Sequence, residues 1–169
     1  MLRAVQLLAS EEYGLRCLMQ VARADGDGPV SIAQIAEAEG LSPEYTAKLM
    51  RELRLGELVR SVRGAVGGYR LARPADEISV WNALQVLGGA FFSQTFCECH
   101  PGQRKRCVRT GNCSIRAIWS ALQNALREAL DRISLADLRR DEPAMGSWVE
   151  GWLEPIPLER GAAAKRRAQ

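Results

Sequence analysis

Hydrophobic and polar positions near the start of the chain repeat with the period of an amphipathic helix. Ser10 is a suitable N-cap, and Glu11 and Glu12 suit a first helical turn because carboxylates are favoured near the positive end of the helix dipole. The apolar stripe continues to Ala22, and the sequence DGDGP at residues 25–29 then interrupts it. A first helix is therefore predicted between Ser10 and this break.

Two further helices joined by a tight turn follow in the pattern. Ser31 and Gln34 match a capping box, and Gly40 is suited to end the short helix that this box begins. Ser42 and Pro43 are the residue types preferred at the N-cap and first position of a third helix. A short helix, a glycine-containing turn and a second capped helix form a helix-turn-helix.

A β-hairpin and a fourth helix are predicted next. Residues 58–71 alternate between apolar and polar side chains, and Gly64, Gly67 and Gly68 interrupt them before the second arm. This pattern is typical of two short antiparallel strands, the wing of a winged helix-turn-helix. Residues 78–87 favour another helix, which a pair of glycines ends. The predicted fold class is mainly α with a small β-hairpin wing.

The longest apolar repeat predicts a long dimerisation helix. From Ser114 onward, apolar residues recur at alternating steps of four and three residues, the spacing of a coiled-coil seam, and Leu130 widens the stripe. The seam consists of Ile115, Trp119, Leu122, Leu126, Ala129 and Ile133. A single helix with such a stripe needs a partner, and a second copy related by a two-fold axis is the expected one. A homodimer is therefore predicted.

These patterns divide the 169-residue chain into three parts. Residues 1–75 are predicted to form a winged helix-turn-helix DNA-binding domain, and residues 76–138 a cysteine-rich, cluster-binding loop with the dimerisation helix. Residues 139–169 are predicted to form a C-terminal arm that is partly disordered. No apolar run reaches membrane-spanning length, and no cleavage-type signal is evident. We therefore expect a cytoplasmic protein with no membrane partner.

The placement of basic residues points to double-stranded DNA, whereas the net charge of +3 is too small to do so. Residues 48–73 carry seven basic side chains against two acidic ones, and these fall on the third helix and the wing. Both elements contact DNA in winged helix-turn-helix proteins. The candidate DNA-binding residues are Ser42, Tyr45, Thr46, Lys48, Arg51, Arg63 and Gly64. The competing interpretation is that the charges form a solvated helix face.

Four of the five cysteines lie between residues 97 and 113, together with the only histidine, His100. Thiolates at this density suit a soft metal or an iron–sulfur cluster. Basic residues surround them and favour an anionic cluster, and Cys113 lies near the start of the long helix, where backbone N–H groups stabilise a thiolate. Cys17 lies apart on an apolar helix face and is predicted to be a core residue.

Two other interpretations of these cysteines stay open. Cys97, Cys99, Cys107 and Cys113 could close a tetrahedral zinc site without further ligands, although their spacing lacks the paired CxxC knuckles usual for zinc. The CxC sequence at residues 97–99 suits a thiol oxidoreductase, but nothing nearby supplies a substrate pocket or a general base. We therefore expect a regulatory protein and not an enzyme.

Three segments resemble the small dimeric bacterial winged-helix regulators typified by IscR, NsrR and RirA. They are EYGLRCL at residues 12–18, the third helix with its SVRG–GGY wing at residues 41–73, and the cysteine loop that runs into CSIRAIW at residues 113–119. The resemblance covers about residues 10–138. It implies a homodimeric transcription regulator, acting as a repressor, that binds a palindromic operator and senses redox state, nitric oxide or iron–sulfur status.

The resemblance adds roles to residues that the charge pattern had selected. Residues that match Ser42, Tyr45, Thr46 and Lys48 lie at the DNA in this family. The residue that matches Arg63 enters the minor groove.

The resemblance also implies a [2Fe–2S] or [4Fe–4S] cluster that three cysteines hold with the spacing C-x5-C-x5-C. Cys107 and Cys113 match this spacing, but the first cysteine of the pattern is displaced here. Either Cys99 or Cys97 could be the third ligand, and both could serve.

A fourth ligand outside the cysteines is implied as well. IscR-like members use a histidine at the position of Arg116, so this chain lacks that ligand. Other members use an acid on the first helix, which would match Glu12, and His100 is a further candidate ligand. An acid in a first helical turn is also favoured by the helix dipole alone.

Overall fold

The computed structural model describes residues 7–64, 67–89, 92 and 96–151. Met1–Arg139 form one compact unit, and Arg140–Gln169 form a second. The basic end of the C-terminal arm, which we predicted to be disordered, lies outside the described residues. None of the described helices is both long and apolar enough to span a lipid bilayer.

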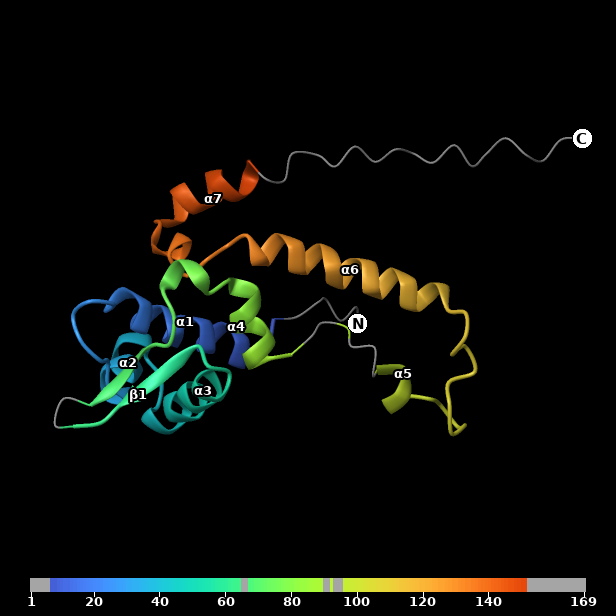
Figure 1. The fold of residues 1–169 in the computed structure, drawn as a ribbon, viewed down its shortest axis with the longest axis horizontal. Coiled ribbons are helices and arrows are strands. Elements are labelled where there is room, and N and C mark those ends of the chain that lie inside the picture. The colour runs from blue at the N-terminus through green and yellow to red at the C-terminus, as the bar shows by residue number, and fades with distance from the viewer. Residues whose placement is uncertain (1–6, 65–66, 90–91, 93–95, 152–169) are drawn as a thin grey trace, which may run out of the picture. The chain divides into compact units, whose positions relative to one another are not determined.

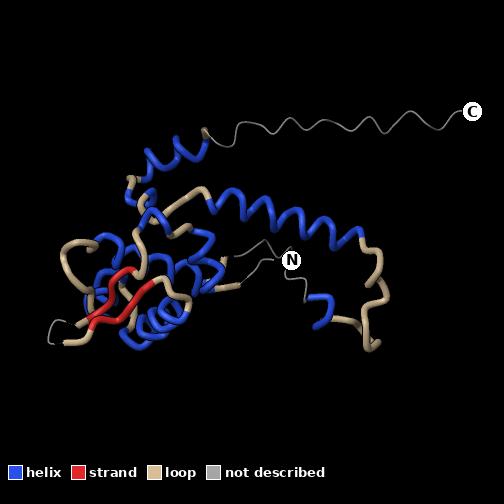
Figure 2. Tube along the Cα trace, in the orientation of Figure 1, coloured by secondary structure: helices blue, strands red, loops and turns tan. Residues whose placement is uncertain are grey.

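The described chain is mainly helical, with two strands that pair as an antiparallel hairpin (Figure 1, Figure 2). The helices are α1 (Ala9–Arg23), α2 (Ile32–Glu39), α3 (Pro43–Leu55), α4 (Val80–Leu87), α5 (Phe96–Cys99), α6 (Ser114–Asp131) and, in the second unit, α7 (Glu142–Glu150). The strands are β1 (Val59–Val62) and β2 (Gly68–Leu71), and the short 3-10 helices are η1 (Ala75–Glu77) and η2 (Asp137–Arg139). The predicted fold class, mainly α with a β-hairpin wing, is confirmed.

Local hydrogen bonds form the caps that were predicted for α2 and α3. The backbone N–H of Ser31 donates to Oε1 of Gln34 at 2.9 Å, and the backbone N–H of Gln34 donates to Oγ of Ser31 at 3.3 Å. Gly40 ends α2 in the left-handed conformation with φ of 66°. Oγ of Ser42 accepts a hydrogen bond from the backbone N–H of Tyr45 at 3.2 Å. These contacts set the tight turn that leads from α2 into α3.

The first helix starts earlier than its pattern predicted. Leu8 is the N-cap in place of Ser10, and Oε2 of Glu11 accepts a hydrogen bond from the backbone N–H of Leu8 at 2.6 Å. The Glu11 carboxylate therefore accepts a backbone hydrogen bond at the N-terminus of α1, where a serine side chain was expected to act as the cap. The serine cap was therefore a wrong prediction, whereas the acidic first turn was correct.

A third segment supports the wing along β2. The backbone N–H of Val30 donates to the carbonyl oxygen of Tyr69 at 2.9 Å, and the N–H of Tyr69 donates to the carbonyl oxygen of Val30 at 2.8 Å. Gly68 permits this close approach, because a Cβ atom at Gly68 would lie 2.4 Å from the Val30 oxygen. The wing is therefore held to the helical part of the domain by backbone pairing as well as by its own strands.

The core joins α1, α2, α3, α4 and the segment that follows α6. Its fully buried side chains include Leu18, Ile35, Leu49, Leu53 and Leu135. A core of this kind orients the exposed side of α3 because the opposite side of that helix is immobilised.

The end of α6 differs from the predicted seam. Ile133 lies beyond the helix and is buried, and its carbonyl oxygen accepts a hydrogen bond from the N–H of Val80 at 2.7 Å. Ile133 therefore packs into the core and does not continue the coiled-coil stripe. No side chain of α6 itself is buried in the single chain.

Candidate functional site

The second helix of the helix-turn-helix, α3, presents two of its predicted basic residues to solvent. Lys48 and Arg51 are exposed, and Ser42 is exposed at the N-cap. The opposite side of the helix carries the core residues Leu49, Met50 and Leu53. The helical period thus separates a core-facing side from a polar side that carries positive charge.

Thr46 was predicted to lie at the DNA, but the structure places its side chain inside the domain. Thr46 is 0% exposed, and its position falls on the same helix side as Leu49 and Leu53. Its Oγ1 is a buried side-chain oxygen without a hydrogen-bond partner among the described residues. A direct contact between this hydroxyl and DNA is therefore excluded unless the domain opens.

Tyr45 is half-buried and contacts a residue that the charge pattern did not select. Its ring meets the ring of Tyr13 on α1 edge-on, with centroids 6.2 Å apart and an interplanar angle of 83°. The guanidinium of Arg16 lies 5.4 Å above the Tyr13 ring, and its Nε donates to Oε2 of Glu39 at 2.7 Å. Contacts from α1 and α2 thus support the start of α3. Tyr13 and Arg16 both lie within the EYGLRCL motif, which was the available sequence signal.

The wing presents Arg63 and Gly64 to solvent directly after β1. Gly64 adopts a φ of 128°, a conformation that L side chains rarely adopt, so a glycine is needed at this turn. Val59 pairs with Leu71 at the base of the hairpin, and both side chains are buried there. The buried base and the glycine turn together fix where Arg63 leaves the domain.

Two of the loop cysteines, Cys97 and Cys107, line one pocket of about 470 Å³. Its other lining residues are Glu98, Lys105, Arg106, Thr110 and Arg116. Three of these carry positive charge, which suits an anionic ligand such as a thiolate-held iron–sulfur cluster. The chemistry of the donor set therefore fits the implied cofactor.

Cys113 occupies the N-cap of α6, as the sequence suggested. The backbone N–H of Arg116 donates to Sγ of Cys113 at 3.4 Å, the type of contact that stabilises a thiolate. Arg116, which stands where the resemblance implied a histidine ligand, closes the loop instead. Its Nη2 donates to the carbonyl oxygens of Thr110 at 2.8 Å and Arg109 at 3.3 Å.

Cys99 and His100 lie at the exposed end of α5. Nδ1 of His100 lies 3.0 Å from the carbonyl oxygen of Phe96, and the two rings stack with centroids 4.3 Å apart. The histidine is thereby held by its own helix turn. Neither Cys99 nor His100 lines the pocket that Cys97 and Cys107 share.

Glu12 is exposed on α1 and lines a different pocket, together with Arg16 and Glu39. Among the described residues, no group of three or more cysteine, histidine or acidic side chains is arranged to hold a metal. A single chain thus brings together Cys97 and Cys107 but neither the complete cysteine set nor Glu12.

Cys17 differs from the loop cysteines in its surroundings. It is 0% exposed within the core, and burial raises the pKa of its thiol to about 11. The thiol therefore stays neutral at physiological pH and acts as a small apolar side chain, as predicted.

The comparisons with known proteins agree on one family. The Rrf2 family model, described as an iron-dependent transcriptional regulator, matches residues 8–141. The protein rrf2 of Nitratidesulfovibrio vulgaris is 35% identical over 137 residues, which are 81% of this chain and 89% of that protein. The regulator IscR of Sodalis glossinidius is 33% identical over 138 residues, which are 82% of this chain and 81% of that protein.

Solved structures show the same relationship in three dimensions. The chain is similar to T. potens IscR with a TM-score of 0.64 and 34% identity, covering 83% of this chain and 91% of that one. It is similar to CymR of B. subtilis with a TM-score of 0.63 and 30% identity, covering 82% of this chain and 100% of that one. The chain therefore belongs to the Rrf2 family of transcriptional regulators.

Proposed function

We propose that this Rrf2-family regulator acts as a homodimeric repressor that reads duplex DNA and senses redox state, nitric oxide or iron–sulfur status through a cysteine-held cluster. One observation carries the proposal: a loop with four cysteines leads directly into α6, a helix that exposes an apolar stripe, and α6 returns to the core of a winged helix-turn-helix. A ligand in that loop is therefore connected through one helix to the DNA-reading domain.

The DNA contacts follow from the exposed side chains of α3 and the wing. α3 would lie in the major groove, with Ser42 bonding a phosphate and with Lys48 and Arg51 supplying charge and guanine recognition. Arg63 on the glycine turn would enter the adjacent minor groove. Two such domains related by a two-fold axis would read a palindromic operator.

The cluster ligands are proposed from the loop. Cys107 and Cys113 are the first two, and Cys97 is favoured over Cys99 as the third because it shares a pocket with Cys107. Glu12 is proposed as the fourth ligand, which a single chain does not bring to the loop. A bound iron–sulfur cluster would supply reversible redox and ligand-exchange chemistry. The basic side chains Lys105, Arg106 and Arg116 would balance the negative charge of the bound cluster.

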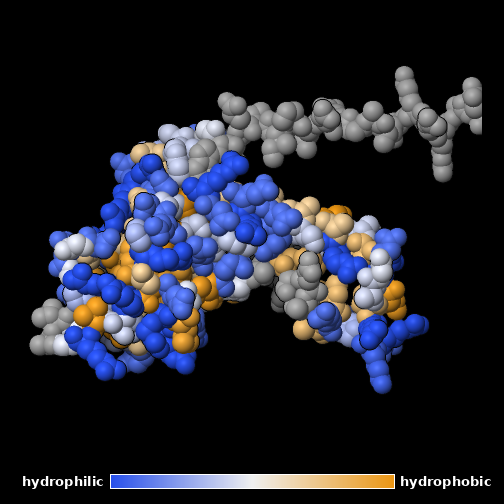
Figure 3. All heavy atoms as spheres, viewed as in Figure 1, coloured by the Kyte–Doolittle hydropathy of each residue, from blue (hydrophilic) through white to orange (hydrophobic). Residues whose placement is uncertain are grey.

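The dimer is proposed to form along α6. Ile115, Ile118, Trp119 and Leu122 expose between 37% and 62% of their surface in the single chain. Figure 3 shows apolar residues at the surface along the part of the molecule that α6 occupies in Figure 1. Burial of this stripe against a second copy would remove it from water. Changes in the loop would then bias the dimer between two spacings of its recognition helices.

The full-length protein purified under anaerobic conditions tests the cluster directly. We expect a coloured protein that contains iron and acid-labile sulfide, because the loop supplies thiolate ligands in basic surroundings. Visible absorption with iron and sulfide analysis measures this. A colourless protein with stoichiometric zinc would contradict the proposed cluster. It would indicate instead a transcription regulator that is stabilised by a four-cysteine zinc site.

Replacement of Arg63 by alanine tests the wing. We expect about tenfold or greater weakening of the affinity for a duplex that the wild-type protein selects from a random pool, because the variant cannot form one charge-assisted hydrogen bond to DNA. Fluorescence anisotropy measures the dissociation constant, and sedimentation checks that the oligomeric state is unchanged. Arg23→Ala is the matched control, since Arg23 is an exposed arginine at the end of α1. An Arg63→Ala protein with wild-type affinity would contradict the wing assignment.

A further inference from the structure

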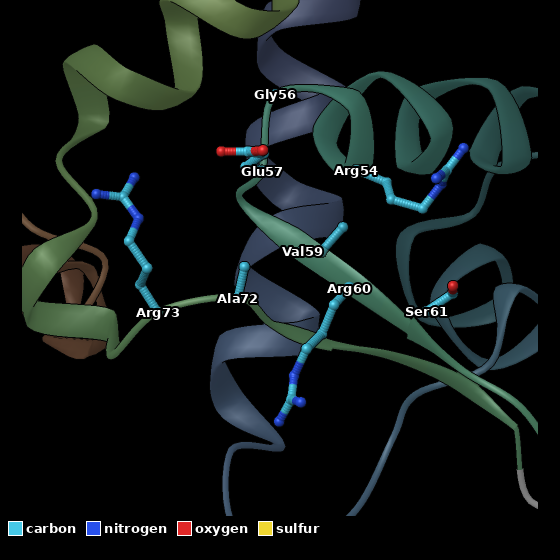
Figure 4. A pocket seen from close by; sticks show the side chains of 8 residues that line it. All are labelled: Arg54, Gly56, Glu57, Val59, Arg60, Ser61, Ala72 and Arg73. Carbon is cyan, nitrogen blue, oxygen red and sulfur yellow. The ribbon is translucent and has the colours of Figure 1, made fainter.

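A second basic surface lies at the base of the wing, away from its tip. It is an open pocket of about 750 Å³ between the end of α3, strand β1 and the segment that follows β2 (Figure 4). Its lining residues are Arg54, Gly56, Glu57, Val59, Arg60, Ser61, Ala72 and Arg73. Three of the eight are arginines and one is acidic, so the pocket carries net positive charge. The pocket thus joins arginines from three segments that are separate in the sequence.

The arginines of this basal pocket are available to a ligand. Arg54 and Arg60 are exposed, and neither side chain has a hydrogen bond or an ion pair with another described residue. Arg73 is exposed and donates one hydrogen bond, from Nη1 to the carbonyl oxygen of Glu77 at 3.4 Å. Guanidinium groups without carboxylate partners attract anions, and Glu57 is the one acidic residue among those that line the pocket.

The pairing of the two wing strands gives independent evidence that Arg60 binds a ligand. Arg60 on β1 lies directly opposite Arg70 on β2. Like charges at directly opposite positions of an antiparallel pair are destabilising. A position that costs stability without forming an internal contact is typical of a functional residue.

The arrangement of the guanidinium groups identifies the kind of anion. Figure 4 shows that Arg54, Arg60 and Arg73 extend in different directions and do not converge on one point. A small phosphorylated molecule needs convergent donors and an enclosing pocket. A nucleic-acid strand, in contrast, presents phosphates at regular intervals along an extended surface. Divergent arginines around an open pocket therefore suit a strand of DNA better than a small ligand.

Continuity with the proposed DNA surface supports the same occupant. Arg54 follows Arg51 by three residues on α3, so the two side chains are neighbours on the helix. Arg60 lies on the strand that leads to Arg63. The basal pocket thus adjoins both elements that are proposed to contact DNA, α3 and the wing.

We propose that Arg54, Arg60 and Arg73 form a phosphate-binding surface for the sugar–phosphate backbone of duplex DNA, which extends the footprint beyond the recognition helix and the wing tip. This inference rests on the proposed DNA-binding function. Phosphate contacts set position and affinity and are independent of base sequence. The basal surface would therefore strengthen binding to all duplexes equally, whereas Arg63 and α3 would provide discrimination.

The test compares Arg60→Gln and Arg73→Gln with the control Arg23→Gln in the full-length protein. Each is titrated by fluorescence anisotropy with a mixed-sequence duplex and with a duplex that the wild type selects from a random pool, over a series of salt concentrations. We expect both variants to bind both duplexes about tenfold more weakly. The slope of log K against log salt should fall by about 0.9 for each phosphate that a variant no longer neutralises. Arg23→Gln should match the wild type.

Thermal unfolding separates a binding effect from a folding effect. The Arg60→Gln protein should unfold at the wild-type temperature or above, because the change removes the repulsion from Arg70. If the wild type binds its selected duplex and both variants show the wild-type affinity and salt slope, the proposal is overturned. Unchanged DNA binding of this kind is what we would expect if the basal surface contacts an acidic protein. If the wild type selects no duplex at all, the proposed function itself fails.

Discussion

The Cys107→Ser protein, purified anaerobically, is expected to lack the visible absorption, iron and sulfide that we propose for the wild type. Cys107 matches the spacing that the resemblance implies for cluster ligands, and it shares a basic pocket with Cys97. Serine has nearly the same shape but offers a hard, protonated oxygen in place of a soft thiolate. Changes to groups that only support metal ligands already reduce metal affinity about 10- to 100-fold. Removal of a ligand itself should reduce the affinity for the cluster by at least the same factor.

Cys17→Ala is the matched control for this experiment. The Cys17 thiol is buried and protonated, with a pKa of about 11, so its removal should leave iron and sulfide unchanged. The same comparison ranks the remaining ligands. Cys97→Ser should reduce the iron content more than Cys99→Ser, because Cys97 lines the same pocket as Cys107 and Cys99 does not. A Cys107→Ser protein with full iron and sulfide would show that the cluster is held elsewhere.

The Leu122→Asp protein is expected to be a monomer at concentrations where we expect the wild type to form the proposed dimer. Leu122 lies on the apolar stripe of α6 with Trp119, and no residue of this helix is buried in the single chain. An unpaired carboxylate buried in an interface costs about 3–5 kcal/mol, which corresponds to roughly a 1,000-fold rise in the dissociation constant of the dimer. Sedimentation velocity over a dilution series measures this constant.

Asn124→Asp is the control for charge on α6. Asn124 is exposed two residues further along, on the opposite side of the helix, so the same charge there should leave the dimer intact. Circular dichroism should show the same helix content in both variants, because Leu122 is not buried in the core of the single chain. If Leu122→Asp sediments as the wild type does, α6 is not the dimer interface.

Most helices and the wing could be predicted because their signals are local. The capping box of Ser31 and Gln34, the cap at Ser42 and the left-handed Gly40 depend on residues within one helical turn. The alternation over residues 58–71, interrupted by Gly64, Gly67 and Gly68, predicted the hairpin in the same way. The start of α1 was missed because the Glu11 side chain satisfies the helix N-terminus in place of a serine.

Two further predictions were wrong, and only the first could have been corrected from the helical period. Thr46 precedes Leu49 and Leu53 by three and seven residues, so it shares their buried side of α3, and a helical wheel would have shown this. Ile133 also continued the α6 stripe in spacing, but the helix ends at Asp131. Ile133 is buried because its segment pairs with the residues before α4, a contact between distant parts of the chain.

The sequence by itself determined α1, α2, α3, α4 and α6 in their order, the wing, the positive charge of residues 48–73 and the four thiols of the loop, whereas α5 and α7 were not predicted. These properties depend on helical and strand periods, on caps and on composition, which act over a few residues. The tertiary structure decided which side chains share a surface. It buried Thr46, placed Cys97 with Cys107, and joined Arg54, Arg60 and Arg73 at the base of the wing. Such contacts link residues on different elements, and only the packing of the common core brings those elements together.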